Sequence, residues 1–236
     1  MAITISEFTP SSGNSGSPIT SNSKSCTASS ALFVIFYCDE WNTAPIPTCT
    51  VTGATEELVV SHRPDTSTPR LTCWVVPDIP GGTTSVEIGG FSGTRNWQIQ
   101  VVELLGAATS SPIDAFDSHH ETSSSQSFYG GPSGGIAIAS GAIAFSIAGI
   151  NNDPGSLTPD TGWTAITGVG TGTGHYLKTA YKVFTSGGSS ERGLQQGAAN
   201  DRIYVGLIAS IKEAAGGGGG TSDVLRRAFP RFILNH

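Results

Sequence analysis

The chain has few charged residues. Asp, Glu, Lys and Arg make up 13% of its 236 residues, about half of the share found in an average soluble domain. The formal net charge is −6, which argues against a nucleic acid as the partner of the folded body, because such binding requires a basic face. The composition therefore excludes one large class of partners before any motif is considered.

Long hydrophobic runs are also missing. The longest mostly apolar stretch, residues 134–150, is interrupted by Ser140, Gly141, Ser146 and Gly149, and it is too short and too rich in glycine for a membrane span. The first 21 residues lack the basic and apolar regions of a secretory signal. We therefore expect no membrane segment, and we expect synthesis in the cytoplasm.

Metal-binding cysteine patterns are absent. The four cysteines, Cys26, Cys38, Cys49 and Cys73, form no CxxC motif and have no paired histidines nearby, so that no zinc site is predicted. Cys38 and Cys73 lie within apolar runs, which favours small buried thiols. Disulfide formation stays open in any of three pairings, although a cytoplasmic origin disfavours all of them.

Catalytic motifs are missing too. The sequence contains no GxSxG motif, and its glycine-rich residues 170–174 do not link a strand to a helix as a phosphate-binding loop would. Glu103 and Asp114 could be proposed as a glycosidase pair, but nothing distinguishes them from other carboxylates. We expect no catalytic residue, no cofactor and no enzyme activity.

Two polar stretches offer oxygen or nitrogen ligands. Residues 114–121 (DAFDSHHE) combine carboxylates with His119 and His120, but adjacent side chains on a strand point to opposite faces. Residues 151–162 contain the Asn, Asp and Gly of a calcium loop, which are also the residues that any turn requires. A solvated polar loop and a turn are the favoured interpretations, so we expect no metal site.

Gly, Ser, Thr and β-branched residues are abundant, and this composition favours strands and turns. Residues 31–37 (ALFVIFY) form a continuous apolar run of strand length, typical of a central strand buried on both faces. Further strands are predicted over residues 2–8, 48–53, 57–63, 70–76, 85–91, 96–106, 135–150 (one or two strands, bent at Gly141), 163–169, 175–186 and 201–212. Many short strands without an amphipathic helix predict an all-β sandwich or jelly roll.

The chain divides into four parts. Residues 1–30 are a Ser/Thr-rich N-terminal arm, either a flexible leader or an arm that pairs with the body or a neighbour, and both alternatives stay open. Residues 31–213 form the β-sandwich domain, and residues 214–220 form a glycine linker. Residues 221–236 are a basic-apolar tail, which could form one helical turn that Pro230 ends.

The tail is the predicted attachment point. It combines apolar and basic side chains. We expect its apolar side chains to bind a partner, because an exposed apolar patch of this size normally marks an interaction site. A disordered terminus is the alternative. The predicted anchoring residues are Val224, Leu225, Arg226, Arg227, Phe229, Arg231, Phe232, Ile233 and Leu234.

Four tryptophans could serve in a sugar-stacking platform. Trp74 and Trp97 lie within predicted strands and are expected in the core. Trp41 and Trp163 lie in a loop and at a strand edge, so they are the candidates for contact with a glycan.

From Ala31 to Lys212, about three quarters of the chain, the order of elements resembles a jelly-roll-like β-sandwich domain of bacteriophage virion structural proteins, also found in secreted bacterial proteins. The resemblance is carried by the turn and strand at Pro80–Phe91 (PGGTTSVEIGGF), the strand and turn at Val101–Ala115 (VVELLGAATSSPIDA), and the closing strand at Asp201–Lys212 (DRIYVGLIASIK). The glycine run with its Arg-containing tail resembles the ends of phage structural proteins. No catalytic residues accompany this resemblance.

The resemblance implies a non-enzymatic virion structural protein of the capsid-decorating, head-fibre or tail-accessory type, synthesised in the host cytoplasm. Its expected partners are other virion proteins, namely capsid or tail subunits, and further copies of itself in a homo-oligomer such as a trimer. The alternative is a carbohydrate-binding module or receptor-binding tail-fibre domain that contacts a host-surface glycan through Trp41 and Trp163. A polysaccharide hydrolase is the third and least favoured hypothesis.

Overall fold

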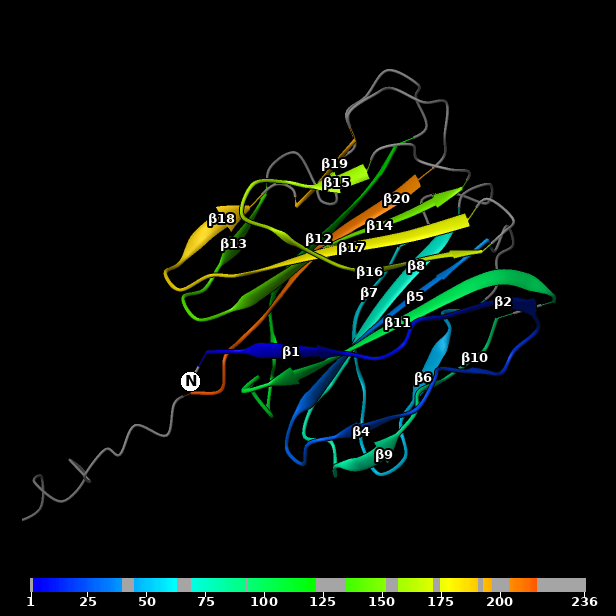
Figure 1. The fold of residues 1–236 in the computed structure, drawn as a ribbon, viewed down its shortest axis with the longest axis horizontal. Coiled ribbons are helices and arrows are strands. Elements are labelled where there is room, and N and C mark those ends of the chain that lie inside the picture. Colours follow the sequence, from blue (N-terminus) through cyan, green and yellow to red (C-terminus); the bar gives the residue numbers. More distant parts are fainter. Residues whose placement is uncertain are drawn as a thin grey trace, which may run out of the picture.

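The computed structural model describes residues 2–39, 45–62, 69–91, 93–121, 135–151, 157–171, 175–190, 193–196 and 204–215. The described residues contain twenty β-strands and no helix (Figure 1). The predicted all-β class is therefore confirmed. Every strand pairing is antiparallel, which suits a chain with short connections.

The first half of the chain forms one main sheet, the first sheet. Its strand order is β1-β11-β5-β8-β7, and β2 also pairs with β11. The bounds are β1 (Thr4–Glu7), β2 (Ser11–Ser15), β5 (Ala31–Cys38), β7 (Glu57–His62), β8 (Arg70–Val76) and β11 (Arg95–Leu105). Strand β5 is central and buried at all of its positions, so the interpretation of its continuous apolar run is confirmed.

The second half forms the other main sheet, the second sheet, with the order β12-β20-β14-β17-β16. The bounds are β12 (Ile113–Glu121), β14 (Ile143–Asn151), β16 (Thr164–Thr171), β17 (His175–Val183) and β20 (Tyr204–Ile211). Each main sheet is thus built from one half of the chain. The jelly-roll topology that the resemblance implied is not confirmed by these strand orders.

Small sheets accompany the two main ones. Strands β3 (Ile19–Thr20), β10 (Glu87–Gly89) and β6 (Thr48–Thr50) form one of them, and β4 (Lys24–Cys26) pairs with β9 (Gly82–Thr84). In the second half, β13 (Ile136–Ile138) pairs with β18 (Gly188–Ser190), and β15 (Leu157–Pro159) pairs with β19 (Leu194–Gln196).

Apolar clusters fill the spaces between these layers. The central core draws residues from both main sheets, among them Phe33 of β5 and Phe145 of β14, whose rings stack with centroids 4.5 Å apart. A second cluster joins the outer face of the first sheet to β3, β6 and β10, and it contains Trp74 and Trp97. Two smaller clusters cover the outer face of the second sheet. The prediction that Trp74 and Trp97 belong to the core is confirmed.

The N-terminal thirty residues pair with the body. Strands β1 and β2 run in succession along β11, while β3 pairs with β10 and β4 with β9. Of the alternatives for this segment, the structure shows pairing with the body of the same chain. Only β1 was predicted here. The Ser- and Gly-rich β2 (SSGNS) has little intrinsic strand preference, and its pairing partner β11 holds it extended.

Residues 114–121 form part of strand β12, so their prediction as a solvated loop is wrong. The polar residues of this stretch lie on an edge strand, which pairs with β20 alone among the described strands. Edge strands tolerate charged and polar side chains because one side lacks a strand neighbour. The bend predicted at Gly141 is confirmed, since this residue lies between β13 and β14 with a positive φ of 82°.

Candidate functional site

The described chain ends in a segment that is fixed to the body. After β20, the amide of Lys212 donates to the carbonyl of Pro112 at 2.7 Å, and the amide of Ala214 donates to the carbonyl of Gly106 at 2.8 Å. The amide of Ala108 donates to the carbonyl of Lys212 at 2.9 Å, and Ala107 forms a β-bridge with Glu213. These contacts define residues 212–215, called here the tail base.

The tail base lies beside a shallow hollow and beside the start of β1. The hollow has a volume of about 390 Å³ and is lined by residues 108–111 and 212–215. The Nζ atom of Lys212 donates to the carbonyl of Ser111 at 3.1 Å across it. Gly106 follows Leu105, which is the partner of Thr4 in the pairing of β11 with β1. The base therefore emerges next to the first strand of the chain (Figure 1).

Trp163, a predicted glycan contact, is half-buried just before β16. Its ring meets the ring of Phe184 edge-on, with centroids 6.4 Å apart and planes at 75°. A Cβ atom added to Gly193 would lie 2.5 Å from the ring, so the indole packs directly against this glycine. Trp163 contacts both small clusters outside the second sheet. The arrangement places at least part of the indole surface against the protein.

A groove lies near this tryptophan. It has a volume of about 410 Å³ and is lined by residues of β15, β16, β17 and β19, among them Leu157, Thr167, Lys178 and Leu194. Leu157 and Leu194 belong to the same apolar cluster that Trp163 contacts. The groove is lined by the polar side chains of Thr167 and Lys178 next to apolar side chains.

The other residues that the sequence singled out lie outside the described residues. These are Trp41 and the nine tail residues between Val224 and Leu234, together with the glycine run of the linker. Residues 152–156 of the second polar stretch also lie outside, and the side chains of His119 and His120 are not described. Within the described part of the chain, no group of three or more His, Cys, Asp or Glu side chains could hold a metal ion.

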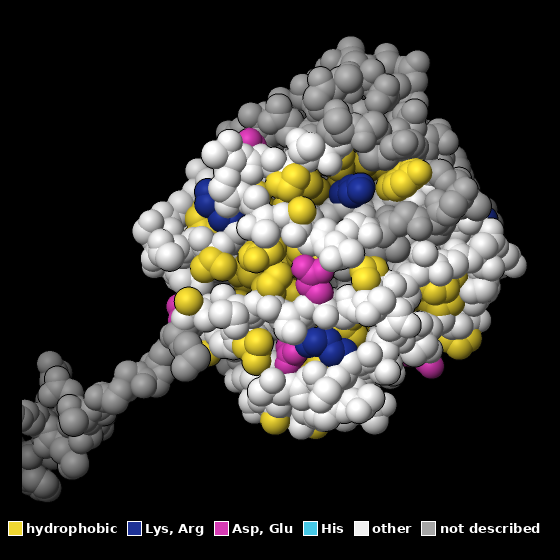
Figure 2. All heavy atoms as spheres, viewed as in Figure 1, with side chains coloured by type: hydrophobic (Ala, Val, Ile, Leu, Met, Phe, Trp, Pro, Cys, Tyr) yellow, Lys and Arg dark blue, Asp and Glu magenta, His cyan; other side chains and the backbone are white. Residues whose placement is uncertain are grey.

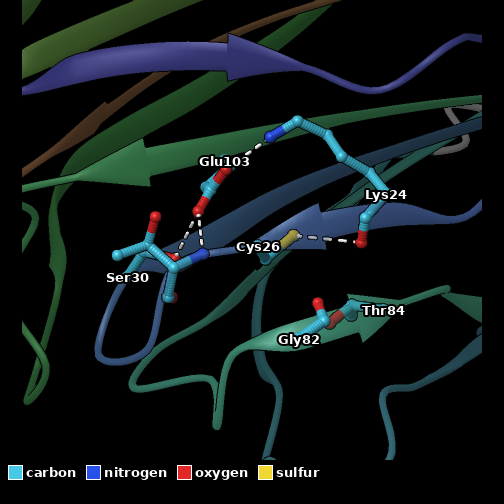
Figure 3. Close-up of polar contacts among 7 residues, drawn as sticks. Lys24, Cys26, Ser30, Gly82, Thr84 and Glu103 are labelled. Carbon is cyan, nitrogen blue, oxygen red and sulfur yellow. Dashed lines mark hydrogen bonds and ion pairs between the residues drawn. The ribbon is translucent and has the colours of Figure 1, made fainter.

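Glu103 is buried on the outer face of β11, where the N-terminal segment covers it (Figure 3). The Lys24 ammonium donates to one carboxylate oxygen and forms an ion pair with it. The amide of Thr27 and the hydroxyl of Ser30 donate to the other oxygen at 2.6 and 3.0 Å. Burial alone would raise the pKa of Glu103, but these hydrogen bonds and the Lys24 charge outweigh it and lower the pKa.

Asp114 is likewise used by the fold. One of its oxygens accepts from the amide of Ala139 at 2.8 Å and from the hydroxyl of Ser210 at 3.0 Å. It thereby links β12 to β20 and to the turn after β13. The two carboxylates considered from the sequence as a glycosidase pair therefore have separate roles in the fold, one in each main sheet.

A polar cluster lies at the end of the sheet pair where β5 ends and β17 begins. The carboxylate of Asp39 accepts from the backbone amide and the side-chain amide of Asn96 at 2.9 and 2.7 Å. The Nε2 atom of His175 lies 3.6 Å from the same carboxylate. Burial lowers the pKa of His175, and the charge of Asp39 only partly offsets this. His175 is therefore held neutral near pH 7.

Two glutamines extend this cluster into the space between the sheets. Gln98 Nε2 donates to the carbonyl of His175 at 2.5 Å, and Gln100 Nε2 donates to the carbonyl of Thr167 at 2.7 Å. Five buried polar atoms here have no hydrogen-bond partner among the described residues: Tyr37 OH, Gln98 Oε1, Gln100 Oε1, His175 Nδ1 and Thr179 Oγ1. No local pattern in the sequence predicts this cluster, since its members come from distant strands.

The four cysteines, all within the described residues, are buried and form no disulfide. Burial raises the pKa of the Cys49 thiol to about 12, with the charge of Glu56 adding to the effect. Burial raises the pKa of Cys73 further, and it also raises that of Cys26. The interpretation of these residues as small buried thiols is confirmed, and the raised pKa values of Cys26, Cys49 and Cys73 are opposite to the lowered pKa of a reactive cysteine.

The comparisons with known proteins found no relatives. No family model, no curated protein and no solved structure matches the chain. In the part of the chain that the structure describes, no helix has the length and apolar character required to cross a membrane.

Proposed function

We propose that the protein is a non-enzymatic structural protein of a bacteriophage particle, of the capsid-decorating, head-fibre or tail-accessory type. Its jelly-roll-like β-sandwich is displayed on the particle, and its terminal segments dock on neighbouring subunits. The observation that carries this proposal is the tail base, where a basic-apolar segment on a glycine linker leaves a body through residues that hydrogen bonds hold in place.

A fixed base suits an attachment segment. Any force on a docked tail passes first to residues 212–215, and their three backbone hydrogen bonds and one bridge spread it over the chain at residues 106–112. A five-glycine linker beyond the base allows the tail to reach a partner surface with little enforced geometry. The combination of a fixed tail base and a glycine linker favours a rigid module that is attached to its partner through a flexible connection.

The carboxylates add support for a structural role. Glu103 and Asp114 accept two or more hydrogen bonds each from their own fold. A hydrolytic pair would instead flank a common substrate position. We propose other capsid or tail subunits and further copies of this chain as the partners, with the particle as the location.

Deletion of residues 221–236 tests the proposal. The truncated protein is expected to fold, because the deletion begins beyond the tail base, and to lose sedimentation with assembled particles. A full-length variant with Leu58→Ser, an exposed side chain on β7, is the control and should still sediment. If the truncated protein folds and sediments like the full chain, the tail is not the anchor.

The second candidate is a carbohydrate-binding module, and the groove next to Trp163 favours it. Thr167 and Lys178 line the groove beside apolar side chains, a mixture that suits a sugar ring. Lys178→Ala should weaken binding on a glycan array, whereas Lys182→Ala, on the same strand but not lining the groove, should not. Equal binding by both variants and the native protein would remove the groove from consideration.

A further inference from the structure

The central core reaches the surface along one side of the sheet pair. Ile5 of β1 is half-buried and packs against this core from the first sheet, and Tyr181 and Val183 of β17 do so from the second. Figure 2 shows hydrophobic side chains grouped in the area between β1 and β17. We call the strip formed by Ile5, Tyr181 and Val183 the apolar seam.

Strand lengths explain why the seam is open. Strand β16 is the edge of the second sheet, and its first residue, Thr164, is the partner of Tyr181. Val183 lies beyond that end of β16, so no strand neighbour covers it on this side among the described strands. Further along, Glu7 of β1 closes the gap by accepting from the amide of Thr167 at 3.2 Å.

The tail base lies at the open end of this seam. Ala214 is hydrogen-bonded to Gly106, and the preceding Leu105 is the partner of Thr4, the residue before Ile5. Ile143, the partner of Val183, is also the partner of Ile211 at the end of β20. The chain therefore leaves the body next to the start of β1, and β14 separates the end of β20 from β17.

The tail has the opposite charge to the body. It contains three of the 12 Lys and Arg residues and one of the 18 acidic residues, which leaves a formal charge of +2 on residues 221–236 and −8 on residues 1–220. Six of its side chains between Val224 and Leu234 are large and apolar. The sequence after the tail base is thus apolar and positively charged, whereas the seam belongs to a negatively charged body, and Glu7 is the carboxylate of β1.

We propose that residues 221–236 dock on the apolar seam of their own chain. The five glycines between Ala215 and Thr221 span up to about 17 Å when extended, and their average span is about 12 Å. This is enough for the chain to turn back from the tail base onto Ile5. Ile5 is the partner of Leu104, two residues before Gly106, which holds the tail base. Attachment to the same body keeps the local concentration of the tail high, which favours its own seam over that of another copy.

This inference rests on the proposed function in taking the tail as a docking segment. It adds where the tail lies before assembly. The seam would then hold the apolar side chains of the tail away from water until a partner subunit competes for them.

Limited trypsin digestion of the full chain tests the docking. The readout is the rate of cleavage between Arg227 and Ala228, followed by mass spectrometry, with the synthetic peptide 221–236 as the undocked reference. Cleavage in the native chain should be slower than in the peptide by about tenfold, the factor that corresponds to about 1.4 kcal/mol of docking. Cleavage at the rate of the peptide would overturn the proposal.

Two sets of variants locate the contact. Ile5→Asp and Val183→Asp should raise the cleavage rate toward that of the peptide, whereas Leu58→Asp, on the exposed side of β7, should leave it unchanged. Phe229→Ser with Phe232→Ser should have the same effect as the seam variants, and these changes leave every described residue of the core unaltered. Protection that survives all of them would place the tail elsewhere.

Dilution separates the same chain from a second copy. Protection by the own seam should not depend on protein concentration, and protection that disappears on dilution would overturn the same-chain assignment. The particle experiment is independent of these results. A tail that docks on the seam but is dispensable for sedimentation refutes the proposed function alone, and a tail that is required for sedimentation but cleaved like the peptide refutes the docking alone.

Discussion

Strand β11 carries two buried polar sites, one on each face. On the outer face, the Glu103 carboxylate accepts from Lys24, from the amide of Thr27 and from the hydroxyl of Ser30. On the inner face, Gln98 and Gln100 each donate one hydrogen bond across the sheet pair, and each leaves its Oε1 atom without a partner among the described residues. One site is charged and fully paired, and the other is neutral and partly paired.

The difference follows from what covers each face. The outer face is covered by a loop of the N-terminal segment, whose backbone amide and hydroxyl can turn toward a carboxylate. The inner face is covered by β16 and β17, whose amides and carbonyls are mostly engaged in sheet pairing. A buried charge requires several donors, whereas an amide loses less when one atom stays unpaired. The two faces should therefore respond differently to substitution.

Removal of the Glu103 charge should have the largest effect. Glu103→Gln weakens three hydrogen bonds and leaves Lys24 without its partner, so we expect a loss of about 3 kcal/mol in the free energy of unfolding. Urea denaturation measures this value. Glu87→Gln, at an exposed position of β10, is the matched control and should change stability by less than about 0.5 kcal/mol. A similar small change for Glu103→Gln would show that the pair is not important for stability.

Acidification should separate the two sites. The pKa of His175 is lowered in the fold, so its stabilising contribution is complete above the unfolded value of 6.5 and is lost as the pH falls below it. The pKa of Glu103 is also lowered, and its contribution is lost only at lower pH, below the ordinary glutamate value of 4.5.

Chemical denaturation between pH 8 and 3 measures both losses. The slope from His175 should not exceed about 1.4 kcal/mol per pH unit, because one proton is bound. His175→Gln should abolish the loss near pH 6 and keep the one at lower pH, whereas Glu103→Gln should do the opposite. If both variants retain both losses, other groups control the acid response.

Gln100 should matter less than Glu103 although both are buried on one strand. Gln100→Met loses the hydrogen bond to the Thr167 carbonyl but also removes an unpaired Oε1 atom, so the two terms oppose each other. We expect a change in the free energy of unfolding within about 1 kcal/mol, of either sign. A loss as large as that of Glu103→Gln would mean that the inner site is fully paired in solution.

The apolar strands of the first sheet could be predicted from the sequence. The continuous run of β5 and the strand β8 were placed within one residue of their bounds, because a period or run of apolar residues is a local signal. Strands β2 and β12 could not be predicted, since SSGNS and DAFDSHHE have no such signal. Their partners β11 and β20 supply the hydrogen bonds that hold them extended.

The buried polar sites could not be predicted from the sequence for a related reason. In β11 the alternation of Ile99 and Val101 with polar residues is typical of a strand with one solvent-exposed face, yet both faces of β11 are covered. The donors to Glu103 lie 73 to 79 residues away in the chain, and no spacing rule connects them. The predicted strand begins at Trp163, one residue before β16, and the packing of Trp163 against Gly193 depends on a residue 30 positions later.

Thiol labelling should detect how tightly the N-terminal segment is held on β11. Cys26 lies in β4, two residues from Lys24, and is 7% exposed, whereas Cys49 and Cys73 are 1% and 0% exposed. In the native protein we expect slow labelling by a thiol reagent, in the order Cys26, Cys49, Cys73, because each reaction requires local opening and a thiolate.

Glu103→Gln should change this pattern locally. The variant loosens the contacts that hold residues 24–30 on β11, so Cys26 should react faster, by about tenfold for each 1.4 kcal/mol lost in local opening. Cys73 lies between β5 and β7 on the far side of the sheet, and its rate should rise only through global unfolding. Both rates are measured by mass spectrometry. Equal acceleration of the two thiols would mean that the N-terminal segment opens only together with the whole fold. Glu103 would then stabilise the two main sheets as much as it stabilises the N-terminal segment that covers it.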